Sequence, residues 1–138
     1  MENAPSNHEV KDPLGHVKLA VSDFALSFDF YKSLFSKLGY AQVSHKLASA
    51  GWVTPEGFGI WIAQAENDIP PLEHGAPGFH HLCMKAQSPQ DVDELHTQLL
   101  ETEIHIFNPP QNYPQYTENY YAVFFADPDG MKLEVAYY

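Results

Sequence analysis

The sequence predicts an α+β fold of two βαβββ modules, whose eight strands form a curved, cupped sheet. Two observations lead to this prediction. The order of strand-like and helix-like segments in residues 14–66 repeats in residues 78–138. In addition, the first strand of each half carries a histidine, His16 or His81. The alternative is a single ferredoxin-like domain with extra strands, but the repeated histidine-bearing strand favours an internal duplication.

The first module is expected to open with a strand and a helix. HVKLAV (16–21) alternates between two kinds of residue and is rich in β-formers, which is typical of a strand. SDFALSFDFYKSLFSKLGY (22–40) has large apolar residues at helical spacing. Ser22 or Asp23 is placed to cap the start of this helix, and Gly39 to end it. Three strands are expected after it, at AQVSHKL (41–47), AGWVT (50–54) and FGIWIAQA (58–65).

A linker and a second module complete the chain. Residues 67–77 are rich in proline and glycine and poor in apolar residues, which indicates a linker. SPQDVDELHTQLLE (88–101) then predicts a helix with Ser88 as its cap and Pro89 at its first position. The sequence DPDG (127–130) is typical of a tight turn. The expected strands of this module are HHLCMKA (80–86), HIF (105–107), YYAVFFA (120–126) and MKLEVAY (131–137).

Composition excludes several classes of function. The chain has 18 acidic and 7 basic residues, a formal net charge of −11, and all of its basic residues are lysines. Nucleic-acid binders need a basic face and depend on arginine, so we expect no nucleic-acid partner, and no anionic membrane partner either. Cys83 is the single cysteine and allows no intrachain disulfide. Residues 1–13 are expected to be a loose polar leader, no run is apolar enough to span a bilayer, and the expected location is the cytoplasm.

Alternation along three strands places polar side chains on one face of the predicted sheet. His16, His81 and Glu134 each lie opposite aliphatic residues of their own strand. Two histidines and one carboxylate are the ligand set of a metal site with open positions for water or substrate. The same alternation puts His80 on the opposite face from His81. It therefore predicts that His81→Ala abolishes metal binding, whereas His80→Ala leaves it nearly intact.

Three stretches resemble one known superfamily: GHVKLAVSDFALSFDFYKSLFSKLGY, GFHHLCMKA and FFADPDGMKLEVAY. They are similar to the vicinal oxygen chelate superfamily, which includes glyoxalase I, bleomycin-resistance proteins and extradiol dioxygenases. The resemblance spans residues 14–138. It implies the two-module fold and a divalent metal ion (Zn, Ni, Mn, Fe or Co) held by His16, His81 and Glu134. It also implies a small oxygen-chelating substrate and a homodimer, with the modules paired within one chain or swapped between two.

The chain departs from the best-known members of that superfamily at three positions. Ala20 stands where glyoxalase I has an arginine that holds a glutathione carboxylate, and the chain contains no arginine, which argues against lactoylglutathione lyase activity. Trp61 stands at the position of the fourth, glutamate ligand of glyoxalase I, with Gln64 as the other candidate for that ligand. Phe124 replaces a tyrosine of extradiol dioxygenases. Lyase, isomerase and dioxygenase chemistry therefore all stay open.

Two classes of function are weighed. The first is a metal enzyme in which the ion stabilises a developing oxyanion or enolate and Glu134, when displaced from the ion, acts as a base. The second is a non-catalytic protein of the bleomycin-resistance type that binds a small molecule or sequesters an antibiotic; a metal site retained only from ancestry is a third possibility. Residues 108–121 are expected to form a lid, unless their tyrosines only pin the loop. The candidate substrate-binding residues are Trp61, Cys83, Tyr113, Tyr116, Tyr120 and Phe124.

Overall fold

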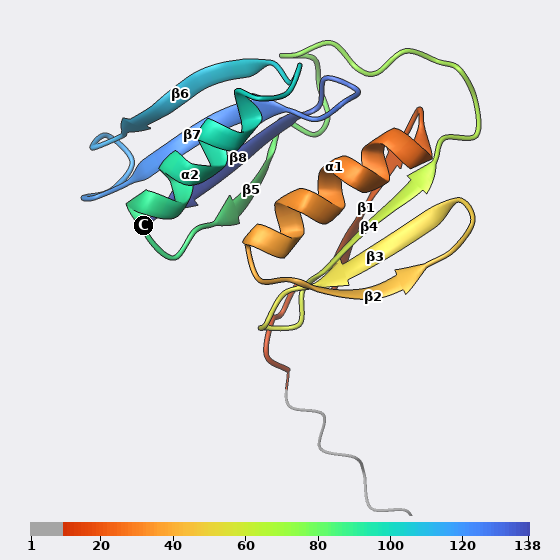
Figure 1. The fold of residues 1–138 in the computed structure, drawn as a ribbon, viewed down its shortest axis with the longest axis horizontal. Helices are drawn as coiled ribbons and strands as arrows, with labels where there is room; N and C mark the ends of the chain where they lie inside the picture. Colours follow the sequence, from red (N-terminus) through yellow and green to blue (C-terminus); the bar gives the residue numbers. More distant parts are fainter. Residues whose placement is uncertain (1–9) are drawn as a thin grey trace, which may run out of the picture.

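The computed structural model describes residues 10–138. In this part of the chain, each half forms a four-stranded sheet covered by one helix, which confirms the predicted two-module α+β fold (Figure 1). Residues 1–9 of the expected leader lie outside the described residues. Neither of the two helices in residues 10–138 is long and apolar enough to cross a membrane.

The first module has the sheet order β1-β4-β3-β2, in which β1 and β4 are parallel. Asp23, rather than Ser22, caps its helix, because the Asp23 carboxylate accepts a hydrogen bond from the backbone N–H of Leu26. Gly39 follows the helix with a φ of 78°, a conformation that glycine adopts easily. The elements of this module are β1 (His16–Val21), α1 (Phe24–Lys37), β2 (Ala41–His45), β3 (Ser49–Val53) and β4 (Gly59–Gln64).

The second module repeats this arrangement with the sheet order β5-β8-β7-β6. Its strand β6 extends to Asn112, so residues 108–112, which the sequence placed in a loop, belong to the sheet. Pro109 and Pro110 are tolerated in β6 because this strand is the edge of the sheet and its pairing with β7 is irregular. The elements are β5 (Leu82–Lys85), α2 (Pro89–Leu99), β6 (Ile106–Asn112), β7 (Tyr121–Ala126) and β8 (Lys132–Tyr137).

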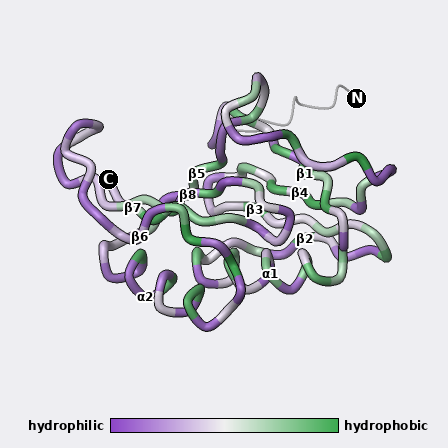
Figure 2. The backbone as a smooth tube through the Cα atoms, turned by 90° about the horizontal axis from the view of Figure 1, so that it is seen from above, coloured by the Kyte–Doolittle hydropathy of each residue, from purple (hydrophilic) through white to green (hydrophobic). Residues whose placement is uncertain are grey.

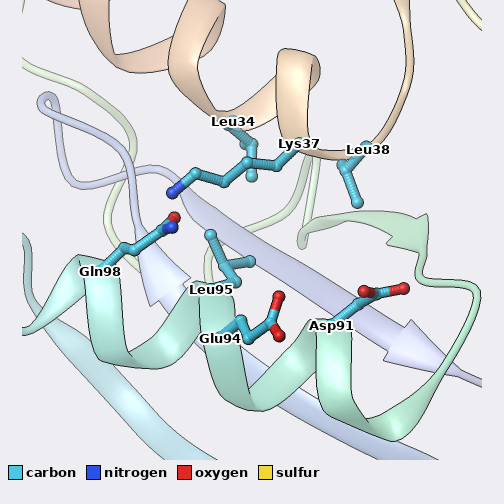
Figure 3. Close-up of a pocket in the computed structure, with 7 residues that line it drawn as sticks. All are labelled: Leu34, Lys37, Leu38, Asp91, Glu94, Leu95 and Gln98. Atoms are coloured by element: carbon cyan, nitrogen blue, oxygen red, sulfur yellow. The ribbon is translucent and has the colours of Figure 1, made fainter.

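The two helices lie on the same side of the two sheets (Figure 2). The apolar side chains beneath them form one continuous core that spans both modules. Phe30 of α1, for example, meets Phe125 of β7 edge to face, with ring centroids 6.4 Å apart. A cavity of about 110 Å³ lies between α1 and α2 (Figure 3). It is lined by Leu34, Lys37, Leu38, Asp91, Glu94, Leu95 and Gln98.

A buried hydrogen bond ties the first module to the second. The Tyr31 hydroxyl on α1 donates to the Asp127 carboxylate at 2.7 Å, and both side chains are buried. Asp127 also accepts hydrogen bonds from the backbone N–H groups of Asp129 and Met131, each at 2.9 Å, and so stabilises the DPDG turn. The side chain of Ser22 donates to Asp129 of the same turn. We call this set of contacts the Tyr31–Asp127 latch.

The predicted alternation is confirmed by burial in β1 and by the division of side chains between two clusters in β8. In β1, Leu19 and Val21 are buried, whereas His16 and Lys18 are exposed. In β8, Leu133 belongs to the core beneath the helices. The opposite face of the second sheet carries a smaller apolar cluster, formed by Tyr113, Ala122, Phe124 and Ala136 with Cys83, Phe107 and Tyr120 against it.

Candidate metal centre

His81 and Glu134 meet on the face of the second sheet that is opposite the helices. Glu134 lies on β8, is 2 % exposed, and pairs in register with Cys83 of β5. His81 comes immediately before β5, and its Nε2 atom lies 3.0 Å from Oε1 of Glu134. The structure therefore brings two of the three predicted metal ligands together.

Tyr120 holds the other oxygen of Glu134. Its hydroxyl donates to Oε2 at 2.5 Å. Burial and the hydrogen bond to Glu134 raise the pKa of Tyr120 far above its ordinary value, so the hydroxyl remains a donor at neutral pH. Tyr138 stacks on the Tyr120 ring with centroids 4.6 Å apart, a contact that sequence alternation did not predict because Tyr138 follows the last strand.

Three other aromatic candidates divide into two roles. Phe124 on β7 meets the ring of His81 edge to face, with centroids 5.7 Å apart, so it lines the candidate site. Tyr113 is buried, and its hydroxyl accepts a hydrogen bond from Gln111 at 2.7 Å. Tyr116 stacks on Tyr113 with centroids 5.3 Å apart. These contacts match the expectation that the tyrosines pin the loop.

Cys83 lies in the same cluster and is half-buried. Burial, followed by the negative charge of Glu134, raises the pKa of Cys83 to about 12. The thiolate is the reactive form of cysteine, so this environment keeps Cys83 unreactive at neutral pH. A role as lining, rather than as a nucleophile, fits these surroundings.

The other predicted residues lie on the first module. His16 is exposed on β1, and Trp61 is half-buried on the neighbouring strand β4. Among residues 10–138, no three histidine, cysteine, aspartate or glutamate side chains gather into a group that could hold a metal ion. The structure of one chain thus leaves His16 apart from His81 and Glu134.

Gln64, the other candidate for a fourth ligand, has a structural role. Its Oε1 atom accepts from the backbone N–H of Phe24 at 3.0 Å, and its Nε2 atom donates to the backbone oxygen of Ser22 at 2.8 Å. Both polar atoms are therefore used in joining the end of β4 to the start of α1.

The expectation that His80 points away from His81 is wrong. The Nδ1 atoms of these two histidines lie 2.7 Å apart, within hydrogen-bonding distance. Strand β5 begins only at Leu82, so the alternation of side chains does not extend back to residues 80 and 81. The structure therefore places a chain of contacts through His80, His81, Glu134 and Tyr120.

The chemistry of these donors suits a divalent metal ion. A buried carboxylate is stable only when it is paired with a cation, coordinated to a metal or fully hydrogen-bonded. His81 Nε2 and Glu134 Oε1, 3.0 Å apart, can both reach one ion at the distance of about 2.1 Å that is typical of nitrogen and oxygen ligands. Tyr120 and His80 contact the outer atoms of the two ligands, as outer partners of metal sites commonly do.

Comparisons with known proteins find relatives over most of the chain. Residues 13–135 match the model of the Glyoxalase/Bleomycin resistance protein/Dioxygenase superfamily. The chain is 26 % identical to the uncharacterized protein YqjT of Bacillus subtilis, over 87 % of this chain and 94 % of that protein. It is also 26 % identical to the virulence protein STM3117 of Salmonella typhimurium, over 92 % of this chain and 85 % of that one. A glyoxalase/bleomycin resistance protein from Albidiferax ferrireducens has the same fold, with a TM-score of 0.75, 24 % identity and coverage of 92 % and 100 % of the two chains.

Proposed function

Because the chain belongs to the Glyoxalase/Bleomycin resistance protein/Dioxygenase superfamily, we propose that it is a divalent-metal-dependent enzyme that acts on a small substrate with two adjacent oxygen atoms. The observation that carries this proposal is the buried carboxylate of Glu134, which faces His81 through one oxygen and Tyr120 through the other. Such a carboxylate favours a cation beside it. We further propose that the protein acts in the cytoplasm, since its single cysteine needs no oxidising compartment.

We assign the third ligand, His16, to a second copy of the chain. Two features support a site shared between two chains. The polar face of the first sheet, which carries His16 and Lys18, is exposed in a single chain. The Tyr31–Asp127 latch joins the two modules of one chain, and in this arrangement no three possible ligands gather among residues 10–138. In a symmetric homodimer each site would then take His16 from one chain and His81 with Glu134 from the other.

In this proposal each site residue of the second module has a distinct role. His81 and Glu134 would hold the ion, and Tyr120 orients the Glu134 carboxylate through its hydrogen bond to Oε2. The bound ion supplies Lewis-acid polarisation of the adjacent substrate oxygens. Glu134 Oε1 would be the oxygen that accepts a proton from the substrate and later returns it. Phe124 and Cys83 exclude water from the carboxylate.

A non-catalytic binding protein is the second candidate. The aromatic cluster of Tyr113, Tyr120 and Phe124 favours it, because such a cluster can hold a planar ligand without a metal. Glutathione is disfavoured as a ligand under both candidate functions. Ala20, at the position of the arginine that would hold a glutathione carboxylate, is an exposed, uncharged residue of β1.

Metal analysis of protein purified without a histidine tag tests the proposal. We expect about one divalent ion per chain and the molecular mass of a dimer, measured by elemental analysis and by light scattering after gel filtration. Protein that stays metal-free after incubation with Mn²⁺, Fe²⁺, Co²⁺, Ni²⁺ and Zn²⁺ in turn would contradict the enzyme proposal. If this metal-free protein still bound aromatic ligands, the second candidate would replace the first.

Substitution of His80 should also weaken metal binding, contrary to the prediction from strand alternation. A neutral His81 that binds an ion through Nε2 would carry its proton on Nδ1, and His80 Nδ1, 2.7 Å away, would then be the acceptor. We expect His80→Ala to lower metal affinity by about 10- to 100-fold, as the loss of an outer partner does at other metal sites. Competition with a metal-sensitive dye measures it. His80→Asn, which keeps an acceptor, should restore most of the affinity, and an unchanged affinity in His80→Ala would sink this role.

A further inference from the structure

The indole of Trp61 lies against glycine positions of the first sheet, where no side chains are present. Gly51 pairs with Trp61 across β3 and β4, and a Cβ atom at Gly51 would lie 2.5–2.6 Å from three atoms of the indole. A Cβ atom at Gly59 would lie 3.2 Å from the indole Nε1. Neither glycine has a positive φ, so the backbone conformation does not require glycine at these positions. Their missing side chains instead make room for the indole.

The indole of Trp61 is only partly buried within residues 10–138. Trp61 is half-buried, yet it belongs to neither hydrophobic cluster and makes no aromatic contact within this part of the chain. Trp52, the other tryptophan, is in contrast 1 % exposed and packs against Phe28 and Phe35 in the core. A large aromatic side chain that rests on glycine positions and stays partly exposed is typical of a binding surface.

The polar end of this indole lies beside the candidate ligand His16. His16 pairs in register with Gly59, and a Cβ atom at Gly59 would lie 3.1 Å from the His16 Cβ and 3.2 Å from the indole Nε1. The absent side chain of Gly59 thus keeps the space between the histidine and the indole open. A molecule held by the metal at His16 would therefore have the indole as its neighbour.

We propose that Trp61, seated on Gly51 and Gly59, is a stacking platform that selects oxygen-chelating ligands with a planar conjugated ring. This inference rests on the proposed function only for the metal that anchors the oxygen atoms. The contact between the planar ring of the ligand and the indole does not depend on the metal. Stacking between aromatic rings contributes about 0.5–1.5 kcal/mol beyond the burial of area, so the platform should favour a planar ring over an open-chain chelator by up to about tenfold.

Two small chelators test the platform. Tropolone is a planar ring with two adjacent oxygens, and acetohydroxamic acid is an open-chain chelator with the same number of oxygen donors. Calorimetric titration of the metal-loaded protein should give a loss of tropolone affinity of about tenfold in Trp61→Leu and a smaller loss in Trp61→Phe. Acetohydroxamic acid should bind all three proteins within about twofold. Equal losses for both chelators, or no loss for tropolone, would overturn the platform.

A pair of glycine substitutions separates the platform from a general disturbance of the sheet. Gly51→Ala displaces the indole and should weaken tropolone binding as Trp61→Leu does. Gly15→Ala is the matched control, because its added methyl group meets nothing within 4 Å and its φ is not positive. Tropolone affinity that falls equally in both glycine variants would contradict a role of the indole seat.

The same measurements distinguish failure of the platform from failure of the proposed function. If the protein holds no metal, the metal proposal fails, and the platform is tested on metal-free protein by saturation-transfer NMR from the protein to the ring protons of tropolone. This transfer should be present in the wild type and lost in Trp61→Leu. If the indole is instead covered by the second chain, Trp61→Leu weakens the dimer and leaves tropolone binding unchanged, which overturns the platform.

Discussion

Replacing His81 with alanine should lower the affinity of the protein for divalent metal by more than about 100-fold, which exceeds the cost of losing an outer partner of a metal site. Among the described residues, Glu134 has two hydrogen-bond partners, and His81 is the one that supplies a nitrogen. The variant removes this nitrogen. Equilibrium dialysis against Zn²⁺ or Mn²⁺ measures the loss. His96→Ala on α2 is a matched control, because this helix lies on the other side of the sheet, and its affinity should stay unchanged (Figure 2).

Glu134→Gln should lose metal to a similar extent but should not lower the stability of the metal-free protein. The substitution keeps the size of the side chain and an oxygen for Tyr120, and it removes a charge that is buried without a cation. Chemical denaturation of metal-free protein should therefore give an equal or higher free energy of unfolding than in the wild type. A variant that retains its metal would refute the assignment of Glu134 as a ligand.

Asp127→Ala should lower the free energy of unfolding by about 3 kcal/mol. The Tyr31 hydroxyl, which is fully buried, would lose its acceptor, and the N–H groups of Asp129 and Met131 would lose theirs. Tyr31→Phe removes only one of these three hydrogen bonds and should cost about 1 kcal/mol. Denaturation at fixed protein concentration measures both losses. Ser22→Ala, which alters an exposed contact with the same turn, is the control and should change stability by less than about 0.5 kcal/mol.

The Tyr31–Asp127 latch also predicts the sign of a pH dependence. Burial raises the pKa of Asp127, and the hydrogen bonds from Tyr31 and the turn only partly oppose this effect. The folded protein therefore keeps the proton of Asp127 at a higher pH than the unfolded chain, whose aspartate pKa is about 3.9. The free energy of unfolding should consequently fall as the pH rises from about 4 through the folded pKa. Asp127→Asn should remove this part of the slope, and an unchanged slope would contradict the buried environment assigned to Asp127.

Much of the fold and half of the candidate site could be predicted from the sequence. Alternation in β1 and β8 is set by which side chains enter the core, so it indicated the face on which His16 and Glu134 lie. His81 precedes β5, so alternation does not account for its position. The helix caps Asp23 and Ser88 were predictable because capping depends on local chemistry. The approach of His81 to Glu134 follows from the parallel pairing of β5 with β8.

Other features depend on long-range contacts or on irregular backbone, which sequence patterns do not report. Strand β6 runs through Pro109 and Pro110 because it is a sheet edge, and this position in the sheet is decided by topology. His80 meets His81 because both residues precede the strand, outside the range of alternation. The seat of Trp61 on Gly51 could have been suspected, since a glycine inside a strand often marks a close approach.

The central claim is that one metal site takes His16 from one chain and His81 with Glu134 from the other. Complementation between two defective chains tests this claim most directly. The His16→Ala chain and the His81→Ala chain are each expected to bind no metal as a homodimer. The two chains are coexpressed with two different affinity tags other than polyhistidine. The heterodimer is isolated by purification on both tags in succession, and its metal content is measured.

Sites shared between chains predict about one metal ion per heterodimer. In that arrangement one site combines both substitutions, and the other combines the intact His16 of one chain with the intact His81 and Glu134 of its partner. Sites contained within single chains would each lack one histidine. A heterodimer as free of metal as the two homodimers, isolated from cells in which the wild type is metal-loaded, would contradict the shared site.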